Sequence, residues 1–484
     1  MLRTLAILVA AQSGVVLGLS QGATYYVAPD GNDEQPGSAK APFRTLARAE
    51  REVGPGDTVI VRDGVYHLGP GGFVTRKSGT ADAPITWKAE HVGKATLINW
   101  QRVEGWEKHE GSIYKVAMEK RPLCLLEDED HLFHATADRV RYLDEKWAPG
   151  RWDWEDGVLR VWLWEGDSPE RHVMRASHGN IVNLTGDASY QVWDGFVIEY
   201  GLCGWKTHYP ECRHNVVRNC TFRYLGQGIL GAEDAVIEHN YFYNIGSSKW
   251  HHGIYDGKRN TIIRYNIFEK ISGGALHLYP RPANISAYGN VIRGPKVEHT
   301  LGKGQVGIYA WGEGGHRIYR NVIYGGHAVG ISNNASGNLI ANNTILDVTG
   351  TGIYLHGDRT GNRMLNNVIS GRSCLVQITT APNELDHNLY AGGESWVWGG
   401  ESLTAFAHWR RASGQDAHSL FGADPLLADP ANEDFVPLRG SPLIDAGCLV
   451  PGVTNGVGGS APDVGAYEVG RVAAPAPGPQ RRAR

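Results

Sequence analysis

An asparagine followed by a short apolar stretch recurs along the middle of the chain. The copies read RNCTF, HNYFY, YNIFE, GNVIR, RNVIY, NNTIL, NNVIS and HNLY, with asparagines at Asn219, Asn240, Asn266, Asn290, Asn321, Asn343, Asn367 and Asn388. Neighbouring copies lie 21 to 31 residues apart, and a Gly-bounded motif such as GIYDG, GIYAW or GIYLHG recurs between them. A period of this length, made of strands and turns, predicts coils that stack, because one coil cannot bury its apolar face alone.

The coils are expected to be strands rather than helices. Each period holds short runs of Val, Ile, Tyr and Phe between Gly and Asn, without a helical period of useful length. The sequence therefore predicts an all-β fold, a parallel β-helix that forms a single-stranded solenoid with coils of about 22 residues. We interpret the Asn column as structural, because a turn Asn can hydrogen-bond to the Asn of the next coil and tolerates a left-handed backbone.

The N-terminus is typical of a secretory signal peptide. Arg3 precedes an apolar run from Leu5 to Leu19, and small residues follow it, so residues 1–23 are expected to be removed. Because no later segment is apolar enough to cross a membrane, we expect a secreted or periplasmic protein without a membrane partner. The net charge of -4 gives no general attraction to nucleic acid, and we expect a monomer.

Six cysteines stand in the chain, and export would permit disulfides. Cys203 and Cys212 bracket one short loop and are the candidate pair. Buried free thiols are the alternative, because six cysteines in a chain of this length do not form a disulfide framework.

Composition shifts divide the remaining chain into five segments. A Trp-rich stretch interrupts the repeat and reads as hairpins, for example RWDWEDGVLRVWLW with a turn at Asp156-Gly157. A short helix is expected at SLTAFAHWRRAS, and the Pro-, Ala- and Arg-rich tail is expected to be disordered. The expected segments are an N-terminal cap with the first coils at 24–98, an inserted β-rich module at 99–178, the main β-helix at 179–395, a closing segment at 396–470 and a tail at 471–484.

The two ends of the repeat resemble a known family. The N-terminal end of its members resembles two stretches of this chain, TYYVAPDGNDEQPGSAKAPFRTLARA and GPGDTVIVRDGVY. Their C-terminal closure resembles FAHWRRASGQDAHSLFGADPLLADP and PDVGAYE. The family is that of secreted right-handed parallel β-helix proteins of the pectate-lyase-like superfamily. This resemblance covers nearly the whole mature chain and implies the handedness of the fold and secretion. It does not decide the reaction, since the fold hosts lyases, hydrolases, epimerases and binding proteins.

One column of side chains is expected to face outward along the coils. Side chains alternate along a strand, so the Ile of Gly-Ile-Tyr faces the core and the Tyr faces out. At GGALHLYPRP the same alternation places His277, Tyr279 and Arg281 outside. The predicted substrate-binding members of the groove are Tyr255, Tyr309, Trp311, Lys303 and His356.

Loop lengths predict two walls around the coil that carries His277. Most loops from an Asn to the next Gly-opened strand take 8 or 9 residues, but Asn240 to Gly253 takes 13 and Asn290 to Gly307 takes 17. The longer loops contain SSKWHH, with Lys249, His251 and His252, and KVEHTLGKGQ. Residues 249–320 hold eleven Lys and Arg against four Asp and Glu, which favours an anionic polysaccharide or oligosaccharide as the partner.

These residues suit β-elimination on a uronic acid. The reaction needs a base for the proton α to the carboxylate and a cation that neutralises that carboxylate. His277 or a lysine is the candidate base and Tyr279 the proton donor. Arg281 or Lys249 is the candidate carboxylate clamp, assisted by His251 and His252. The sequence does not establish a cofactor. Ca²⁺ is the candidate metal ion, with Asp256 and Glu313 as its two candidate ligands.

Two alternatives remain open. A glycoside hydrolase needs two carboxylates, which Asp256 with Glu313 or Asp234 with Asp256 would supply. The other alternative is a β-helix that binds carbohydrate or serves a structural role without catalysis.

Overall fold

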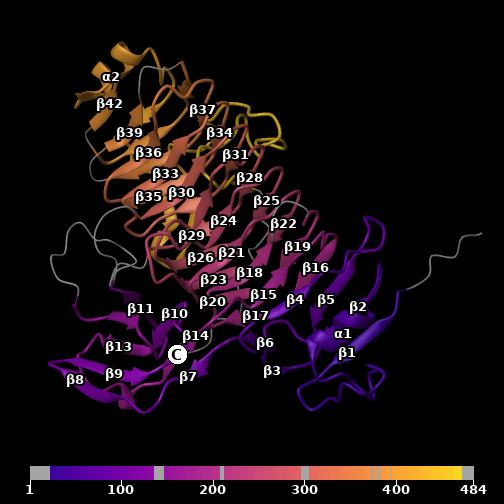
Figure 1. Cartoon of the computed structure of the whole chain (residues 1–484). Coiled ribbons are helices and arrows are strands. Elements are labelled where there is room, and N and C mark those ends of the chain that lie inside the picture. The colour runs from indigo at the N-terminus through magenta and orange to yellow at the C-terminus, as the bar shows by residue number, and fades with distance from the viewer. Residues whose placement is uncertain are drawn as a thin grey trace, which may run out of the picture.

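The computed structural model describes residues 22–135, 147–207, 212–295, 305–371, 374–378, 382–393 and 395–470. Within them the chain winds into a long solenoid of parallel strands (Figure 1). Three 12-stranded sheets line the solenoid, and an 8-stranded sheet stands beside it. The predicted all-β parallel β-helix is therefore confirmed.

Each coil contributes one strand to each of three sheets, called sheets 1, 2 and 3 in chain order. Sheet 1 contains β1 (Thr24–Val27), β2 (Thr58–Val61), β5 (Ile85–Ala89), β16 (Gln191–Asp194), β19 (Val216–Arg218), β22 (Val236–Glu238), β25 (Ile262–Arg264), β28 (Ser286–Tyr288), β31 (Arg317–Tyr319), β34 (Leu339–Ala341), β37 (Arg363–Leu365) and β40 (Glu384–Asp386). Sheet 2 contains β3 (Gly64–His67), β6 (Ala95–Ile98), β17 (Val197–Glu199), β20 (Thr221–Leu225), β23 (Tyr241–Ile245), β26 (Ile267–Ile271), β29 (Val291–Ile292), β32 (Val322–Ile323), β35 (Thr344–Val348), β38 (Val368–Gly371), β41 (Leu389–Ala391) and β44 (Leu420–Phe421).

Sheet 3 contains β4 (Phe73–Thr75), β15 (Val182–Leu184), β18 (Cys203–Thr207), β21 (Gln227–Leu230), β24 (Ile254–Asp256), β27 (Leu276–Leu278), β30 (Val306–Trp311), β33 (Val329–Asn334), β36 (Thr351–Leu355), β39 (Cys374–Ile378), β42 (Ser395–Trp398) and β43 (Glu401–Leu403). We call the turn from sheet 1 to sheet 2 corner 1, that from sheet 2 to sheet 3 corner 2, and that from sheet 3 to sheet 1 corner 3. Inside, like side chains stack from coil to coil: the rings of Phe222, Phe242 and Phe268 follow one another at 4.9 and 4.7 Å.

The predicted Asn ladder lies at corner 1, with a correction at its first member. Asn343 is buried; its Oδ1 accepts from the backbone N–H and Nδ2 of Asn321, and its Nδ2 donates to Asn367 Oδ1 at 3.0 Å. The same pattern runs from Asn240 to Asn388, but Cys220 and not Asn219 pairs with Asn240. The left-handed residue is the one before each ladder position, so Asn219 (φ 54°) is a turn residue.

A second polar column at corner 3 was not predicted from the sequence. His316 takes an Asn position in it, because its Nδ1 accepts from the backbone N–H of Ile285 and its own N–H donates to Asn338 Oδ1. Burial lowers the pKa of His316 to about 4, so its ring is neutral at neutral pH.

The 8-stranded sheet corresponds to the expected Trp-rich insertion at 99–178. Its strands are β7 (Gln101–Arg102), β8 (Glu107–Glu110), β9 (Ile113–Ala117), β10 (Cys124–Glu127), β11 (Asp130–His134), β12 (Arg151–Glu155), β13 (Val158–Trp162) and β14 (Met174–Ser177), and a short 3-10 helix spans Pro169–Arg171. β12 and β13 form the predicted hairpin, whose turn residues Asp156 and Gly157 both have positive φ. The module is inserted between β6 of sheet 2 and β15 of sheet 3, which is at corner 2. It also contacts the solenoid there, because Asn244 Nδ2 donates to Glu129 O at 2.8 Å.

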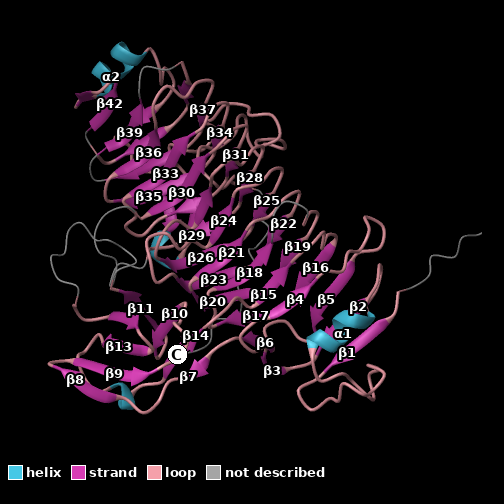
Figure 2. Cartoon of the chain, viewed as in Figure 1, coloured by secondary structure: helices cyan, strands magenta, loops and turns pink. Residues whose placement is uncertain are grey.

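A helix covers each end of the solenoid (Figure 2). α1 (Leu46–Glu52), not foreseen from the sequence, buries Leu46 and Ala49 in the N-terminal coils. α2 (Phe406–Ser413), the predicted helix, buries Trp409 against Trp396 at the other end. Such caps keep the apolar ends of a solenoid from water. Among the described residues, no helix is long and apolar enough to cross a membrane.

The closing segment runs back along corner 1. It contains β45 (Leu427–Asp429), a 3-10 turn at Pro430–Asn432 and β46 (Asp434–Pro437). Asn342 Nδ2 donates to Asp463 O at 2.9 Å, and Asn366 Nδ2 donates to Cys448 O at 2.8 Å. These bonds join the segment to turns of coils that precede it by about a hundred residues. Residues 1–21 and 471–484, on which the expected signal peptide and tail fall, lie outside the described residues.

Candidate functional site

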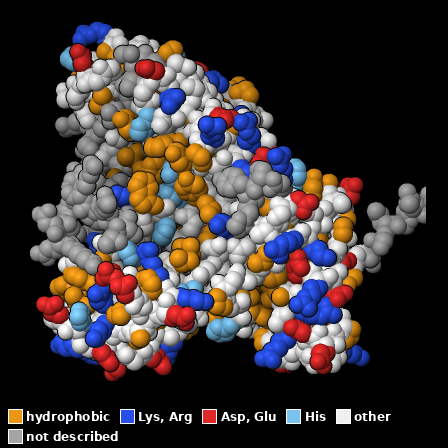
Figure 3. Space-filling view, viewed as in Figure 1, with side chains coloured by type: hydrophobic (Ala, Val, Ile, Leu, Met, Phe, Trp, Pro, Cys, Tyr) orange, Lys and Arg blue, Asp and Glu red, His pale blue; other side chains and the backbone are white. Residues whose placement is uncertain are grey.

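The outer face of sheet 3 carries the predicted column of side chains. The strand register pairs Tyr255 with His277, His277 with Tyr309, and Tyr309 with Ser332. The full column, coil by coil, is Asn183, Lys206, Leu230, Tyr255, His277, Tyr309, Ser332 and Tyr354. Figure 3 shows hydrophobic and His side chains gathered in one patch over β30 and β33.

Corner 2 borders one side of this face. The long loop between Ile245 and Ile254, the long loop between Ile292 and Val306, and the inserted module all leave the solenoid there. The two loops come just before and just after the coil of His277, as the loop lengths predicted. Residues 296–304 of the second loop lie outside the described residues.

His277 lies at the centre of an aromatic cluster rather than freely exposed. Although it belongs to the outward column, it is only 7% exposed, because larger neighbours cover it. Ring centroids lie 4.6 Å away for Tyr309, 5.0 Å for Tyr255, 5.4 Å for Tyr279 and 5.9 Å for Trp311. Of these rings Tyr279 is the most exposed, at 41%. We call this set, with His252, the His277 cluster.

Two histidines form a chain of hydrogen bonds that fixes their protons. The backbone N–H of Gly274 can only donate, and it donates to His252 Nδ1 at 2.8 Å. His252 must then carry its proton on Nε2, which donates to His277 Nδ1 at 2.8 Å. His277 consequently carries its proton on Nε2, and that buried N–H has no hydrogen-bond partner among the described residues.

Burial keeps both rings neutral. It lowers the pKa of His277 to about 4, and it lowers the pKa of His252 well below the ordinary value, helped by the neighbouring histidines. At neutral pH the pair therefore presents one oriented, uncharged N–H donor at the base of the aromatic cluster. A buried donor without a partner costs about 1–3 kcal/mol, so a ligand oxygen there would recover that cost.

A second polar chain continues the column toward the C-terminal coils. Trp311 Nε1 donates to Ser332 Oγ at 3.2 Å, and Ser332 Oγ lies 2.8 Å from His356 Nε2. The His356 ring also packs on Tyr354 at 4.0 Å. Burial lowers the pKa of His356, and Arg359 lowers it further. Trp311 and His356, both predicted as substrate-binding residues, are thus joined through a serine.

The remaining predicted residues border sheet 3 on opposite sides. Lys249 and His251 precede β24 at corner 2; Lys249 is exposed beside the Trp250 ring, and His251 Nδ1 accepts from the Ser247 N–H. Burial lowers the pKa of His251 to about 4. Arg281 follows β27 at corner 3, where it is exposed and makes no ion pair with a described residue.

The carboxylate pairs considered in the sequence do not come together as a catalytic or Ca²⁺-binding pair. Asp256 pairs in register with Leu278 and faces the interior, fully buried, because it is two residues from the core residue Ile254. Glu313 is on the surface at corner 3 in an ion pair with Arg259. Asp234 also lies at a turn, where its Oδ1 accepts from Asn260 Nδ2 at 2.8 Å.

The expectation of a strongly basic groove needs a similar correction. Arg264 pairs with Glu238 at 2.6 Å, Arg293 with Glu269 at 2.7 Å, and Lys258 with Glu233 at 3.4 Å. These pairs lie on other strands and turns, because counting charges along a segment does not separate the faces of a coil. Among the described residues of 249–320, Lys249 and Arg281 are exposed and form no ion pair with a described residue.

Known proteins resemble this chain in the sequence of its coils and in its fold. Residues 177–393 match the model of a family described as NosD, periplasmic copper-binding protein. The crystal structure of pectate lyase Pel9A superposes with a TM-score of 0.50 at 18% identity, over 93% of this chain and 97% of that chain. A structure described as a glycoside hydrolase gives 0.55 at 11% identity, over 83% and 96%.

This chain has the right-handed parallel β-helix fold that these structures share. At such identities the likeness to solved structures shows the fold alone. In sequence, the chain is 23% identical over 457 residues to the uncharacterized protein YwoF of Bacillus subtilis (strain 168), over 85% of this chain and 90% of that protein. Pectate lyase PEL9 of Emericella nidulans is 34% identical over 83 residues, which are 17% of this chain and 20% of the enzyme.

Lys206 is a member of the outward column of sheet 3 that the sequence analysis did not identify. It pairs in register with Leu230, and it lies three coils before the coil of His277 on that same line of the sheet. The segment CGWK carries no Gly-Ile-Tyr motif, and only its Gly before a core Trp could have indicated the alignment. Lys303, predicted as a binding residue, lies outside the described residues.

The cysteines do not form the pair considered from the sequence. Cys203 and Cys212 are both buried, and no disulfide joins them. Burial raises the pKa of the Cys203 and Cys220 thiols to about 12, so both stay protonated at neutral pH. They are packing residues rather than thiolate ligands.

Proposed function

We propose that this protein is a polysaccharide-active enzyme, specifically a lyase that cleaves a uronic-acid-containing polysaccharide by β-elimination on the outer face of sheet 3. One observation carries the proposal: the Gly274–His252–His277 chain presents a neutral, oriented N–H donor inside an aromatic cluster, and the exposed Arg281 follows the strand of His277 at corner 3. Sugar rings pack on aromatic side chains, and a carboxylate is the group that such a donor and a cation would meet together.

The donor would act on the charge that develops during the reaction. When the proton α to the carboxylate leaves, its electron pair forms the new carbon–carbon double bond and the glycosidic C–O bond breaks. Negative charge grows on the carboxylate oxygens along the way, and preorganised donors stabilise it. His277 Nε2–H would donate to one such oxygen, and the Arg281 guanidinium would neutralise the same carboxylate.

This assignment changes the role of His277. As a base it would need a free lone pair on Nε2, but the bond from Gly274 through His252 places the proton there. Lys249 is then the candidate base, which leaves Arg281 as the carboxylate clamp, and Tyr279 is the group that protonates the departing glycosidic oxygen. The exposed Tyr279 ring stacks on the His277 ring at 5.4 Å and His277 Nε2 is buried, so substrate would have to displace a covering ring to reach the donor.

Hydrolysis is less favoured by the geometry. Inverting and retaining glycosidases need two carboxyl groups about 5–9.5 Å apart across the bond. Asp256 faces the interior and Glu313 is tied to Arg259, so the considered pairs do not face the groove. The remaining alternative is a β-helix that binds carbohydrate or serves a structural role without catalysis, and such a protein would release no product from the polysaccharide.

The protein is proposed to act outside the cytoplasm, in line with the periplasmic description of the matched family. We do not extend copper binding to it through cysteine, because the buried Cys203 and Cys220 thiols stay protonated.

The proposal is tested by a substrate screen. The purified protein is incubated with alginate, polygalacturonate and glycosaminoglycans, with and without chelator, and both ultraviolet absorbance and reducing ends are followed. A lyase gives absorbance from the unsaturated product together with new ends. New ends without absorbance would indicate a hydrolase, and binding without either product would reduce the protein to a carbohydrate-binding module.

A further inference from the structure

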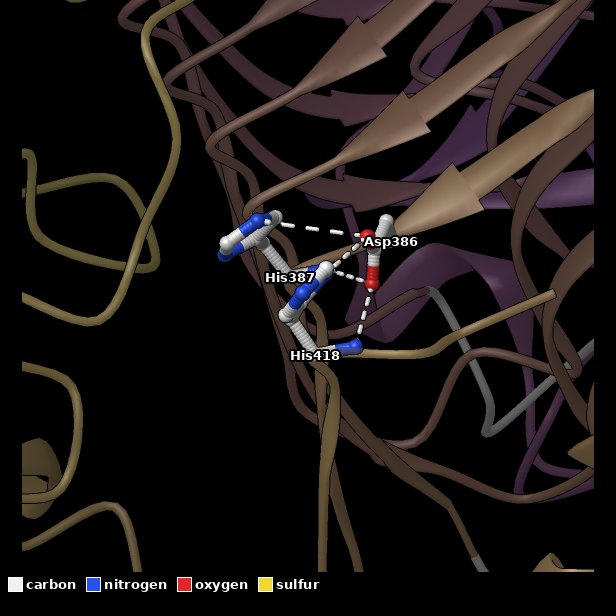
Figure 4. Close-up of side chains that lie close together, drawn as sticks. All are labelled: Asp386, His387 and His418. Atoms are coloured by element: carbon white, nitrogen blue, oxygen red, sulfur yellow. Dashed lines mark hydrogen bonds and ion pairs between the residues drawn. The ribbon is translucent and has the colours of Figure 1, made fainter.

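A second cluster of ionisable side chains lies away from sheet 3, at corner 1 of the last coils (Figure 4). Asp386 ends β40, His387 is the left-handed turn residue before the ladder residue Asn388, and His418 comes from the segment between α2 and β44. One oxygen or nitrogen of each lies within 4.8 Å of those of the others. Residues 31 positions apart are thus joined where the closing segment meets the solenoid.

Backbone donors hold the Asp386 carboxylate in place. Its Oδ1 accepts from the backbone N–H of His387 at 2.9 Å and from the backbone N–H of His418 at 2.7 Å. Oδ2 is left facing the two imidazole rings.

The His387 ring is oriented by a different backbone group. Its Nδ1 lies 3.0 Å from the carbonyl oxygen of Ala446, and because a carbonyl can only accept, Nδ1 carries the proton. Nε2 of the neutral ring therefore holds a lone pair, and it lies 3.9 Å from Asp386 Oδ2. An imidazole whose Nδ1–H is tied to a carbonyl while Nε2 is free is the usual arrangement of a metal-binding histidine.

His418 closes the cluster from the solvent side. Its Nδ1 lies 2.7 Å from Asp386 Oδ2, and its ring stacks on that of His387 at 4.9 Å. The side chain is 66% exposed, so Nε2 faces water. When Nδ1 binds a cation, its proton can move to Nε2 without net change in charge.

We propose that Asp386 Oδ2, His387 Nε2 and His418 Nδ1 bind a divalent first-row metal ion, with Zn²⁺ as the representative. Two imidazoles and one carboxylate are a donor set that such ions favour over Ca²⁺ or Mg²⁺. Ligand atoms of a tetrahedral Zn²⁺ site lie about 3.3 Å apart, given metal–ligand distances near 2.0–2.1 Å. The observed 2.7 and 3.9 Å bracket this value, so small side-chain rotations suffice.

Two other clusters in the described residues lack these features. His172 has both ring nitrogens bonded to carboxylates, at 2.8 Å to Asp128 and 2.9 Å to Asp167, which makes it an ion-pair partner. The exposed group of Asp63, Glu90 and His91 offers only one imidazole. It nevertheless resembles the proposed site in exposing a histidine beside carboxylates, and so provides a matched control.

The site would fasten the closing segment to the solenoid. His387 belongs to the turn after the last strand of sheet 1, whereas His418 and the acceptor Ala446 belong to the segment that follows α2. Because a ligand that binds only the folded state stabilises it by RT ln(1 + [L]/Kd), bound metal should raise the melting temperature. The inference does not depend on the activity proposed for sheet 3.

Chelator-treated protein is titrated with Zn²⁺ by calorimetry, and Co²⁺ absorption reports the ligand geometry. We expect one Zn²⁺ per chain in the wild type and at least a tenfold loss of affinity in His418→Ala and in His387→Asn, which keeps a residue suited to the left-handed turn. His91→Ala should bind as the wild type does. His418 is exposed, so its variant should fold even if the His387 variant does not.

The same samples are melted with and without Zn²⁺. The wild type and His91→Ala should gain stability, whereas His418→Ala should not. Equal stoichiometry and affinity in the wild type and His418→Ala would overturn the proposal. Loss of binding in His91→Ala alone would also overturn it, since the metal would then be adventitious at the other cluster.

Discussion

Asp256 shows how strand alternation decides what a residue can do. It stands next to Tyr255 of the outward column, but its own side chain lies in the interior and is fully buried. Burial raises the pKa of its carboxyl to about 7, although the Lys258 backbone N–H donates to Oδ1 at 3.0 Å and opposes the shift. A raised pKa in the folded state means that this residue destabilises the fold increasingly as the pH rises from about 4 to about 7.

We predict that Asp256→Asn stabilises the protein at pH 8 but not at pH 4. Asn keeps the acceptor for Lys258 without an ionisable group, and the shift of Asp256 corresponds to a gain on the order of 3 kcal/mol above pH 7. Chemical denaturation at both pH values measures it. Unchanged or lower stability of the variant at pH 8 would show that Asp256 is held as a stabilised carboxylate.

At the scale of the turn, the Asn ladder stabilises corner 1 through bonds that no single coil contains. Each ladder Asn accepts from the coil before it and donates to the coil after it, as Asn343 does between Asn321 and Asn367. Removing one amide leaves buried donors and acceptors on both sides without partners. The left-handed residue before it contributes only its backbone conformation.

Asn343→Ala should therefore cost about 3–5 kcal/mol of unfolding free energy, because several buried polar groups lose their partners at once. Asn219→Gly should cost less than about 1 kcal/mol, since Gly accepts the left-handed turn. Denaturant melts of the two variants compare them directly. A similar cost for both would mean that the ladder is no more important than the turn.

The sequence was sufficient for the repeat, the register of the outward column and the loop positions at corner 2. These follow from local periodicity, and the pairing of Tyr255 with His277 and Tyr309 matches the expectation. Asn219 was misplaced by one residue, because the motif contains two adjacent turn positions and only the bonds to Asn240 distinguish them. The helix α1 was missed because its seven residues are too short for a periodic signal.

The chemistry of the candidate site could be predicted only in part. Alternation identified His277 and Tyr279, but not the burial of His277 under neighbouring rings or its bond to His252, which depend on packing between coils. The proton position on His277 depends on a backbone N–H of Gly274, which no sequence pattern indicates. Charge counting failed for the same reason, since cations such as Arg264 and Arg293 have partners on other coils.

At the scale of the whole molecule, the solenoid gives one rigid face and places its additions on one side of it. The inserted module and both long loops leave at corner 2, while the closing segment runs along corner 1. Sheet 3 is thus left with the aromatic column between corner 2 and the turns of corner 3. A long polymer can lie along such a face over several coils, which are about 4.8 Å apart.

The most direct test of this account is the initial rate of unsaturated-product formation by His277→Phe on the polysaccharide that the screen identifies. Phe keeps a ring in the aromatic cluster and removes the donor, so the rate should fall on the order of 100-fold while substrate binding changes less. His239→Phe is the control, because His239 Nδ1 is likewise buried without a hydrogen-bond partner among the described residues but lies at corner 1 beside Tyr265. Wild-type rates in the control with a lost rate in His277→Phe are predicted; a wild-type rate in a folded His277→Phe protein would contradict the account.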